Sequence, residues 1–109
     1  MAELDDNTGA RLSVERGTDG DGQPLLTLAG ELDLSSVESL RRAVEQATAG
    51  APERLTFDMA GLRFMDSAGI AVLLNAAKQV SSVRLRNPTL AVRRVVELTG
   101  LSDVLVVER

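Results

Sequence analysis

Apolar and polar residues alternate in two segments near the start of the chain, residues 11–16 and 25–34. Side chains on a β-strand point to opposite faces in turn, so this alternation predicts two half-buried strands. The intervening residues 17–24 are rich in turn formers and predict a hairpin. Gly30 predicts a bulge or a crowded position in the second strand. The core-facing residues expected from this spacing are Leu12, Val14, Leu26, Leu28 and Leu32.

Three later segments space their apolar residues three and four positions apart, as one face of an α-helix does. The first begins with Ser35 and Glu38, which match a capping box. The third follows Asn-Pro-Thr, with Pro88 expected at the first helical position and Gly100 at the helix end. The expected core faces comprise Val37, Leu40, Val44 and Ala47; Ile70, Leu73, Leu74 and Ala77; and Val92, Val95, Val96 and Thr99.

Short strands are expected between and after these helices, at residues 54–59, 83–86 and 104–107. Strands that alternate with helices favour a sheet whose neighbouring strands are parallel after each crossover. The sequence thus predicts an α/β fold: a single mixed sheet of four to five strands, with helices packed mainly on one face. The 109 residues suffice for one domain, expected at 11–109, preceded by a flexible acidic tail at 1–10.

Composition argues against several kinds of site. The chain has no cysteine and no histidine, so disulfides, thiolate chemistry and histidine-based catalysis are absent. With 12 basic and 16 acidic residues its net charge is −4, a poor match for direct nucleic acid binding. No apolar run suits membrane insertion, and the acidic start lacks signal-peptide character. We expect a cytoplasmic protein with an aliphatic core whose only rings are Phe57 and Phe64.

The segment FMDSAGI, residues 64–70, sets an acid beside a hydroxyl where a strand passes into a helix. A nucleophilic serine needs a base within hydrogen-bond reach. The only lysine, Lys78, lies about three helical turns from Ser67, roughly 15 Å away. The chain is therefore not expected to be an enzyme, and no catalytic residue is assigned. Asp66 or Ser67 caps the helix, or Ser67 is itself modified, because a helix N-terminus tolerates a phosphate.

Acidic residues at the expected ends of elements leave one further alternative open. Asp33, Asp58 and Asp66 would meet at one edge of the sheet, where two or three carboxylates can bind magnesium. The same residue type also forms turns and caps at such places. No glycine-rich phosphate loop is present, since GTDGDG lacks both the spacing and the lysine.

Three segments together resemble the STAS domain of bacterial anti-sigma factor antagonists. They are LAGELDLSS at 28–36, GLRFMDSAGIAVLL at 61–74 and AVRRVVELTGLSDVL at 91–105. The resemblance spans about residues 11–107, nearly the whole chain. It implies the STAS fold, a small mixed sheet with helices on one side.

The resemblance also implies a function in the regulation of transcription. In such antagonists the serine of the Asp-Ser-x-Gly motif, here Ser67, is phosphorylated by an anti-sigma factor serine kinase. The unphosphorylated form binds the kinase and frees a sigma factor, phosphorylation ends the binding, and a PP2C-type phosphatase resets the cycle. No cofactor and no metal are implied. The residues expected to meet the partner are Asp33, Asp66, Ser67, Ala68 and Gly69, with an exposed apolar centre over Ala68–Val72 in which Ile70 faces the core.

Position 68 departs from many antagonists, because Ala68 stands where they carry serine or threonine. Alanine there also resembles the STAS accessory subunits of lipid-transport ABC complexes, which bind the transporter ATPase and need no phosphate. Those subunits often have threonine at the acceptor position, where this chain has Ser67. The antagonist is therefore the first hypothesis and the accessory subunit the second. A small phosphate- or nucleotide-binding domain that uses the aspartates is the third.

Overall fold

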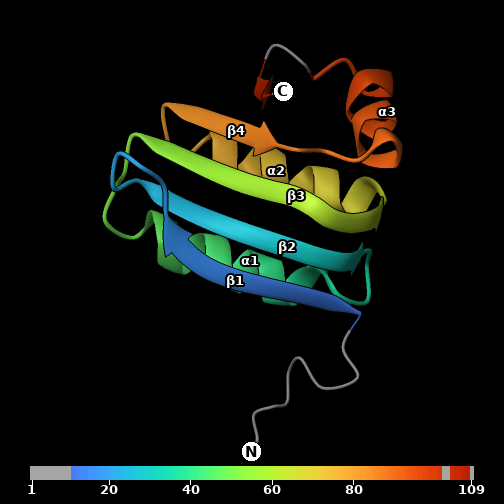
Figure 1. Ribbon diagram of the computed structural model, residues 1–109, viewed down its shortest axis with the longest axis horizontal. Coiled ribbons are helices and arrows are strands. Elements are labelled where there is room, and N and C mark those ends of the chain that lie inside the picture. Colours follow the sequence, from blue (N-terminus) through green and yellow to red (C-terminus); the bar gives the residue numbers. More distant parts are fainter. Residues whose placement is uncertain (1–10, 102–103, 109) are drawn as a thin grey trace, which may run out of the picture.

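A computed structural model gives the fold for residues 11–101 and 104–108, and the expected acidic tail, residues 1–10, lies outside the described residues. The elements are β1 (Leu12–Thr18), β2 (Pro24–Leu32), α1 (Val37–Thr48), β3 (Arg54–Met65), α2 (Ser67–Ala77), β4 (Ser82–Arg86), α3 (Leu90–Leu98) and β5 (Leu105–Glu108). The five strands form one sheet in chain order (Figure 1). β1 and β2 are antiparallel, and each later pair of neighbours is parallel. The predicted single mixed sheet is confirmed.

The helices cover one face of this sheet. α1 packs against β1 and β2, α2 packs against β3, β4 and β5, and the two helices touch each other behind the strands in Figure 1. α3 lies at the carboxyl end of β4 and packs against β3. No helix among the described residues covers the opposite face of the sheet. The prediction that helices pack mainly on one face is therefore confirmed.

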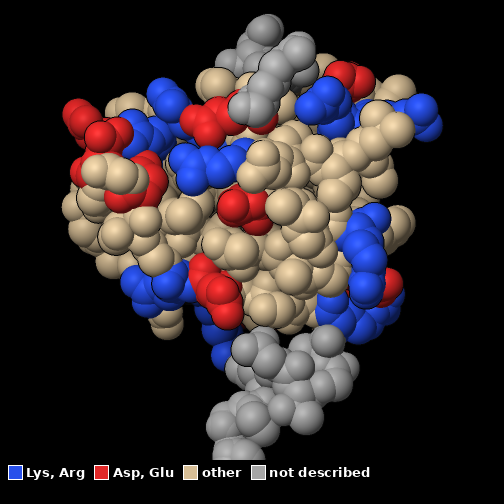
Figure 2. Space-filling model, in the orientation of Figure 1, with Lys and Arg blue, Asp and Glu red and all other residues tan. Residues whose placement is uncertain are grey.

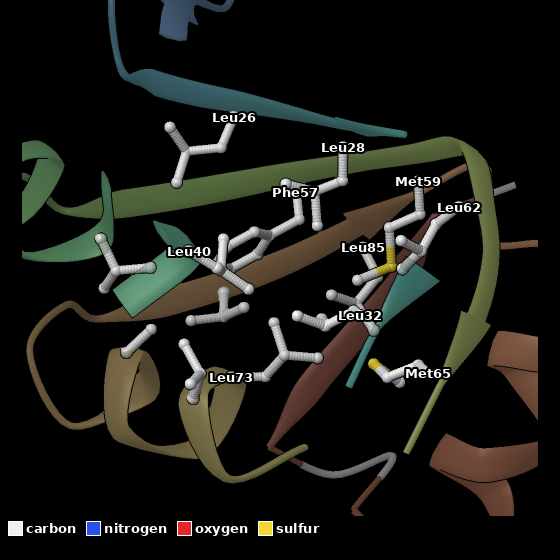
Figure 3. Close-up of a cluster of buried hydrophobic side chains, with 14 of the residues drawn as sticks. Leu26, Leu28, Leu32, Leu40, Phe57, Met59, Leu62, Met65, Leu73 and Leu85 are labelled. Carbon is white, nitrogen blue, oxygen red and sulfur yellow. The ribbon is translucent and has the colours of Figure 1, made fainter. Parts of the chain in front are cut away.

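The core between sheet and helices is aliphatic, with a single ring (Figure 3). Phe57 of β3 is fully buried there, whereas Phe64, near the end of the same strand, is 47% exposed. The prediction that both rings belong to the core is thus wrong for Phe64, which lies opposite Glu31 while Met65 takes the buried side. The core residues labelled in Figure 3 are Leu26, Leu28, Leu32, Leu40, Phe57, Met59, Leu62, Met65, Leu73 and Leu85.

β3 runs six residues further than predicted, and β2 ends two residues earlier. The two strands stay paired as far as Leu32 and Met65 because the register shifts twice, once beside Gly30. Gly30 confirms the predicted crowding: its φ is +105°, and a Cβ there would lie 2.0 Å from the carbonyl oxygen of Arg11. That oxygen accepts a hydrogen bond from the Glu31 amide at 2.7 Å. The extra residues at both register shifts lie in β3, and Gly30 lets the end of β2 come close to the start of β1.

Two helix starts differ from the sequence prediction. The N-cap of α1 is Ser36 rather than Ser35, and its side chain makes no capping hydrogen bond, so the predicted capping box is wrong. The N-cap of α3 is Thr89, whose hydroxyl accepts from the Val92 amide, so Pro88 precedes the helix rather than opening it. The hydroxyls of both N-cap residues, Ser36 and Thr89, also form hydrogen bonds with backbone carbonyls outside their helices. Gly100 follows the end of α3 with φ +72°, as predicted.

Candidate functional site

The helix cap at the start of α2 is Asp66, not Ser67. The Asp66 Oδ1 accepts a hydrogen bond from the Ala68 amide at 2.9 Å, which satisfies a free donor of the first turn. Ser67 is the first residue of α2 and is exposed. Among the described residues, none makes a hydrogen bond with the Ser67 hydroxyl. The hydroxyl is therefore free to react or to be bound.

The end of β2 lies directly beside this helix start. The Asp66 amide donates to the Leu32 carbonyl at 3.1 Å. Gly69 is buried, and a Cβ at that position would lie 2.7 Å from the side chains of both Leu32 and Met65. Glycine therefore lets the first turn of α2 close onto the ends of β2 and β3. Because Asp33 follows Leu32, the fold brings Asp33, Asp66 and Ser67 to one edge of the sheet.

The carboxylate of Asp33 is held by its own chain. Its Oδ1 accepts from the Ser35 amide at 3.0 Å and from the Ser35 hydroxyl at 2.7 Å. Its Oδ2 lies 2.8 Å from the Arg11 guanidinium, and the side chain is 14% exposed. The hydrogen bond from the Ser35 hydroxyl lowers the pKa of Asp33 below its ordinary value, and the Arg11 charge adds to this. Most of the hydrogen-bonding capacity of Asp33 is thus used within the turn.

Arg11 joins the start of β1 to this edge. Its Nε and Nη2 both donate to Glu31 Oε1, at 3.1 Å and 2.7 Å. The pKa of the Arg11 guanidinium is raised by that hydrogen bond and by the charge of Asp33. Arg63 also approaches Glu31, at 3.7 Å. The acidic edge beside Ser67 is therefore partly neutralised by two arginines.

Asp58 does not join the other aspartates. It lies in β3 opposite Thr27 and Arg86, and its Oδ1 accepts from the Ala60 amide at 3.1 Å. Asp58 is seven residues before Met65 along an extended strand, about 20 Å away. The predicted meeting of Asp33, Asp58 and Asp66 is thus wrong. Within residues 11–101 and 104–108, no three acidic or other metal-ligating side chains gather to hold an ion.

The apolar residues at the site are not those expected. Ile70 is buried, as the helical spacing predicts, but Gly69 and Val72 are buried too, so an exposed apolar centre over Ala68–Val72 is wrong. The exposed apolar side chains near this edge belong instead to three neighbouring segments. Leu34 follows Asp33 and is 80% exposed, Phe64 precedes Asp66 by two residues, and Leu90 opens α3 at 64% exposed. The N-cap of α3, Thr89, donates to the Leu62 carbonyl at 3.0 Å, which keeps the start of α3 beside β3. The sequence signal for Leu34 is its place inside the turn residues Asp-Leu-Ser-Ser.

A concave region lies between α1 and α2, away from Ser67. It is a cleft of about 330 Å³, lined by Arg41, Val44, Glu45, Thr48, Ala49, Val72, Asn75 and Gln79. Among the described residues that line it, the one cation is Arg41, which already pairs with Glu38 and Glu45. The cleft therefore offers no free positive charge to a phosphate, which weakens the hypothesis of a nucleotide-binding domain.

Charge is mixed on the open face of the sheet. On the described part of the face shown in Figure 2, basic and acidic side chains are interspersed, mostly around an uncharged middle. Arg84 and Arg86, for example, share Glu108. Such a face does not form the continuous basic surface that binds nucleic-acid phosphates. No helix in the described residues is long and apolar enough to cross a membrane.

Comparison with known proteins identifies the family. The sequence model described as "Mlab, STAS domain" matches residues 17–108, most of the chain. The anti-sigma F factor antagonist of Lysinibacillus sphaericus is 32% identical over 82 residues, which are 71% of this chain and 70% of that protein.

Solved structures agree on the fold. An anti-sigma factor antagonist from Mycobacterium paratuberculosis superposes with a TM-score of 0.80 at 23% identity, over 88% of this chain and 84% of that one. The antagonist SpoIIAA in its unphosphorylated form gives 0.75 at 24% identity, over 89% of each chain. SpoIIAA of Bacillus in the phosphorylated form gives 0.68 at 24% identity, over 89% of this chain and 92% of that one. At these identities the likeness establishes the fold.

Proposed function

This chain belongs to the STAS domain family, and we propose that it is an anti-sigma factor antagonist that acts in the cytoplasm by partner switching. The unphosphorylated form binds an anti-sigma factor serine kinase and so frees a sigma factor. Phosphorylation of Ser67 by that kinase ends the binding, and a PP2C-type phosphatase restores it. The observation that carries the proposal is that the Ser67 hydroxyl at the start of α2, directly after the capping Asp66, is exposed and has no hydrogen-bond partner among the described residues.

The partner has to supply the phosphoryl-transfer chemistry. The chain has no histidine, and Lys78 is the C-cap of α2, at the other end of the helix from Ser67. Asp66 is engaged by the Ala68 amide and acts as a cap. A kinase brings its own base, nucleotide and magnesium, so the substrate needs only an accessible hydroxyl on a rigid element. This supports the role of a phosphorylated regulator rather than an enzyme.

The fold can accept a phosphate at Ser67 without melting. The positive end of the α2 dipole favours negative charge at the first helical position. A phosphate adds about −1.5 to −2 charges at neutral pH. It would add them beside Asp33, Asp66 and Glu31, an edge that Arg11 and Arg63 neutralise only in part. The modification therefore changes the surface that a partner meets and leaves the packing of the domain intact.

The first test is mass spectrometry of the purified chain after incubation with a lysate of the source organism and magnesium-ATP. We expect phosphate on the peptide that contains Phe64–Lys78, assigned to Ser67 by fragmentation. Ser67→Ala is the negative control, and Ser39→Ala, at another exposed serine near the start of a helix, is the matched control that keeps the signal. An unmodified Ser67 in a lysate that phosphorylates a known antagonist would contradict the proposal.

One observation favours a second candidate, the accessory subunit of a lipid-transport ABC complex. The matching family model is described as "Mlab, STAS domain", and Ala68 fits that class. Such a subunit binds its ATPase with no need of phosphate. It predicts stable co-purification with a transporter ATPase that is unchanged by Ser67→Asp. The antagonist predicts a complex with a kinase that Ser67→Asp disrupts.

A further inference from the structure

The turn between β2 and α1, residues 33–36, is unusually well fixed for a surface turn. The Ser36 hydroxyl donates to the Glu31 carbonyl at 2.8 Å and accepts from the Asp33 amide at 3.0 Å. The Ser36 amide donates to the Asp33 carbonyl at 3.0 Å. Together with the two bonds from Ser35 to the Asp33 carboxylate, these contacts close the turn from inside. Its one large side chain, Leu34, is left 80% exposed.

Arg11 fixes the same turn from outside. Its Nη2 lies 2.8 Å from Asp33 Oδ2, and its Nη1 donates to the Ser35 hydroxyl at 3.3 Å. The other side of the guanidinium is held by Glu31 of β2. The turn is thus tied to two strands of the sheet. An apolar side chain held on a rigid frame loses little conformational entropy when a partner covers it.

The turn adjoins the proposed phosphorylation site. The Leu32 carbonyl, two residues before Leu34, accepts from the Asp66 amide next to Ser67. A kinase that places its active site over Ser67 must also cover the surface beside it. The surface that continues from Ser67 onto this turn presents Leu34, whereas Val72, in the segment first expected to give the apolar contact, is buried.

We propose that Leu34 is an apolar anchor for the anti-sigma factor kinase, and that Arg11 and Asp33 are positioning residues that hold it in place. The proposal rests on the proposed function, because its occupant is the kinase that reaches Ser67. Asp33 then contributes to binding mainly through the turn that it organises, since its carboxylate is already engaged. Leu34 plays no part in phosphoryl transfer.

The chain offers a matched control. Leu98, at the end of α3, is 87% exposed, about as much as Leu34. Neither side chain supports the core, so both alanine variants are expected to fold with unchanged urea midpoints. They differ in position, because Leu34 is two residues from Leu32, which bonds to Asp66 beside Ser67, and Leu98 lies at the opposite end of α3 from Leu90 and Thr89. A difference in partner affinity therefore reports the docking surface and not general hydrophobicity.

The experiment measures calorimetric Kd values for the purified anti-sigma factor kinases of the source organism with the full-length chain. For the kinase that binds the wild type, we expect Leu34→Ala to raise Kd about tenfold or more and Leu98→Ala to leave it unchanged. An unchanged Kd for Leu34→Ala, alongside loss of binding by Ser67→Asp, would overturn this inference and leave the proposed function standing. If no kinase binds the wild type, both fail. A Leu34→Ala variant that changes only self-association in sedimentation would also overturn the inference.

A double-mutant cycle tests the positioning role. If Arg11 acts by holding the turn, Arg11→Gln raises Kd in the wild-type background and has little further effect in the Leu34→Ala background. Equal effects in both backgrounds would mean that Arg11 contacts the partner directly, which contradicts the positioning role. Urea midpoints of all variants show that the domain remains folded during these measurements.

Discussion

The β1–β2 ladder has an arginine clamp at each end, and the two clamps differ in burial. At the hairpin end, Arg54 binds Asp19 at 2.7 Å and Asp21 at 2.8 Å, and its side chain is 20% exposed. At the Ser67 end, Arg11 binds Glu31 and Asp33 at similar distances, but its side chain is 53% exposed. The same pair chemistry thus serves two purposes. The hairpin clamp closes a structural corner, and the Ser67 clamp fixes a surface.

The neighbours of the two clamps show the same difference. The carboxylate of Asp19 also accepts from the amides of Asp21 and Gln23, and the Gln23 side chain accepts from the amides of Glu53 and Arg54. These bonds join the hairpin to the start of β3. Beside Arg11, the bonds instead hold a turn that presents an exposed leucine at the same edge of the sheet as the exposed Ser67. A docking site needs residues that are held in place and are not themselves needed for the stability of the fold.

The largest effect is expected from Ser67→Asp on partner affinity. A carboxylate at the centre of the docking edge adds charge beside Asp33 and Asp66 and must be desolvated when the partner binds. Mismatched charges in an interface cost about 2–5 kcal/mol, which corresponds to a Kd at least about 30-fold higher. Titration calorimetry with the kinase checks this value. Ser39→Asp is the control, and equal losses for both variants would show that only net charge matters.

The next effect concerns the glycine that allows β1 to approach the Ser67 end. Gly30→Ala forces a Cβ to within 2.0 Å of the Arg11 carbonyl and places alanine at φ +105°. We expect a loss of about 1–3 kcal/mol in the free energy of unfolding. Gly17→Ala, in the same ladder toward the hairpin, meets no atom within 4 Å and is expected to be near neutral. Urea denaturation checks both, and similar midpoints would contradict the crowding at Gly30.

A smaller pair of effects separates the two clamps. Arg54→Gln leaves Asp19, whose side chain is only 5% exposed, without its guanidinium, and should lower the urea midpoint. Arg11→Gln removes an exposed pair and should lower the midpoint less. Affinity for the kinase should show the reverse order: the Arg11→Gln variant binds more weakly than the wild type, and the Arg54→Gln variant binds as well as the wild type. If the same variant caused the larger loss in both the urea midpoint and the affinity for the kinase, the distinction between the two clamps would be contradicted.

The smallest effect is a dependence of stability on acid pH. The hydrogen bond from Arg54 lowers the pKa of Asp19, and that from Ser35 lowers the pKa of Asp33. A carboxyl whose pKa is lower in the folded chain stabilises the fold above its unfolded pKa, about 3.9, and that stabilisation is lost as the pH falls through the folded pKa. We expect the urea midpoint to fall below about pH 4. Asp19→Asn and Asp33→Asn should each make the urea midpoint depend less steeply on pH in this range. An unchanged pH dependence would contradict the stabilising role given to these two carboxylates.

The sequence predicts the fold well because burial follows residue spacing. Alternation places Leu26 and Leu28 on the helix side of β2, and helical spacing places Leu40 and Leu73 opposite them. The position of Ser67 at the start of α2 follows from the same pattern. The expectation that Phe64 is a core ring rests on composition, since Phe57 and Phe64 are the only aromatic residues, and composition does not say which side of its strand a residue takes.

Tertiary contacts decide the remaining differences. The serines at the start of α1 form a turn with Asp33 instead of a capping box, because Arg11 and Glu31 are brought beside them by the β1–β2 pairing. Asp58 lies far from Asp66 because β3 continues past its predicted end as far as Met65. The exposure of Leu34 likewise depends on a turn that Arg11, from the start of β1, helps to hold. Such contacts become visible only when the strands are assembled.

The most direct measurement follows the complex of the chain with its kinase after magnesium-ATP is added. Light scattering or fluorescence anisotropy reports the bound fraction over time. The account predicts that the wild-type complex dissociates as Ser67 is phosphorylated, while the Ser67→Ala complex forms with similar affinity and persists. Dissociation of the Ser67→Ala complex at the wild-type rate would contradict it, because the switch would then lie elsewhere.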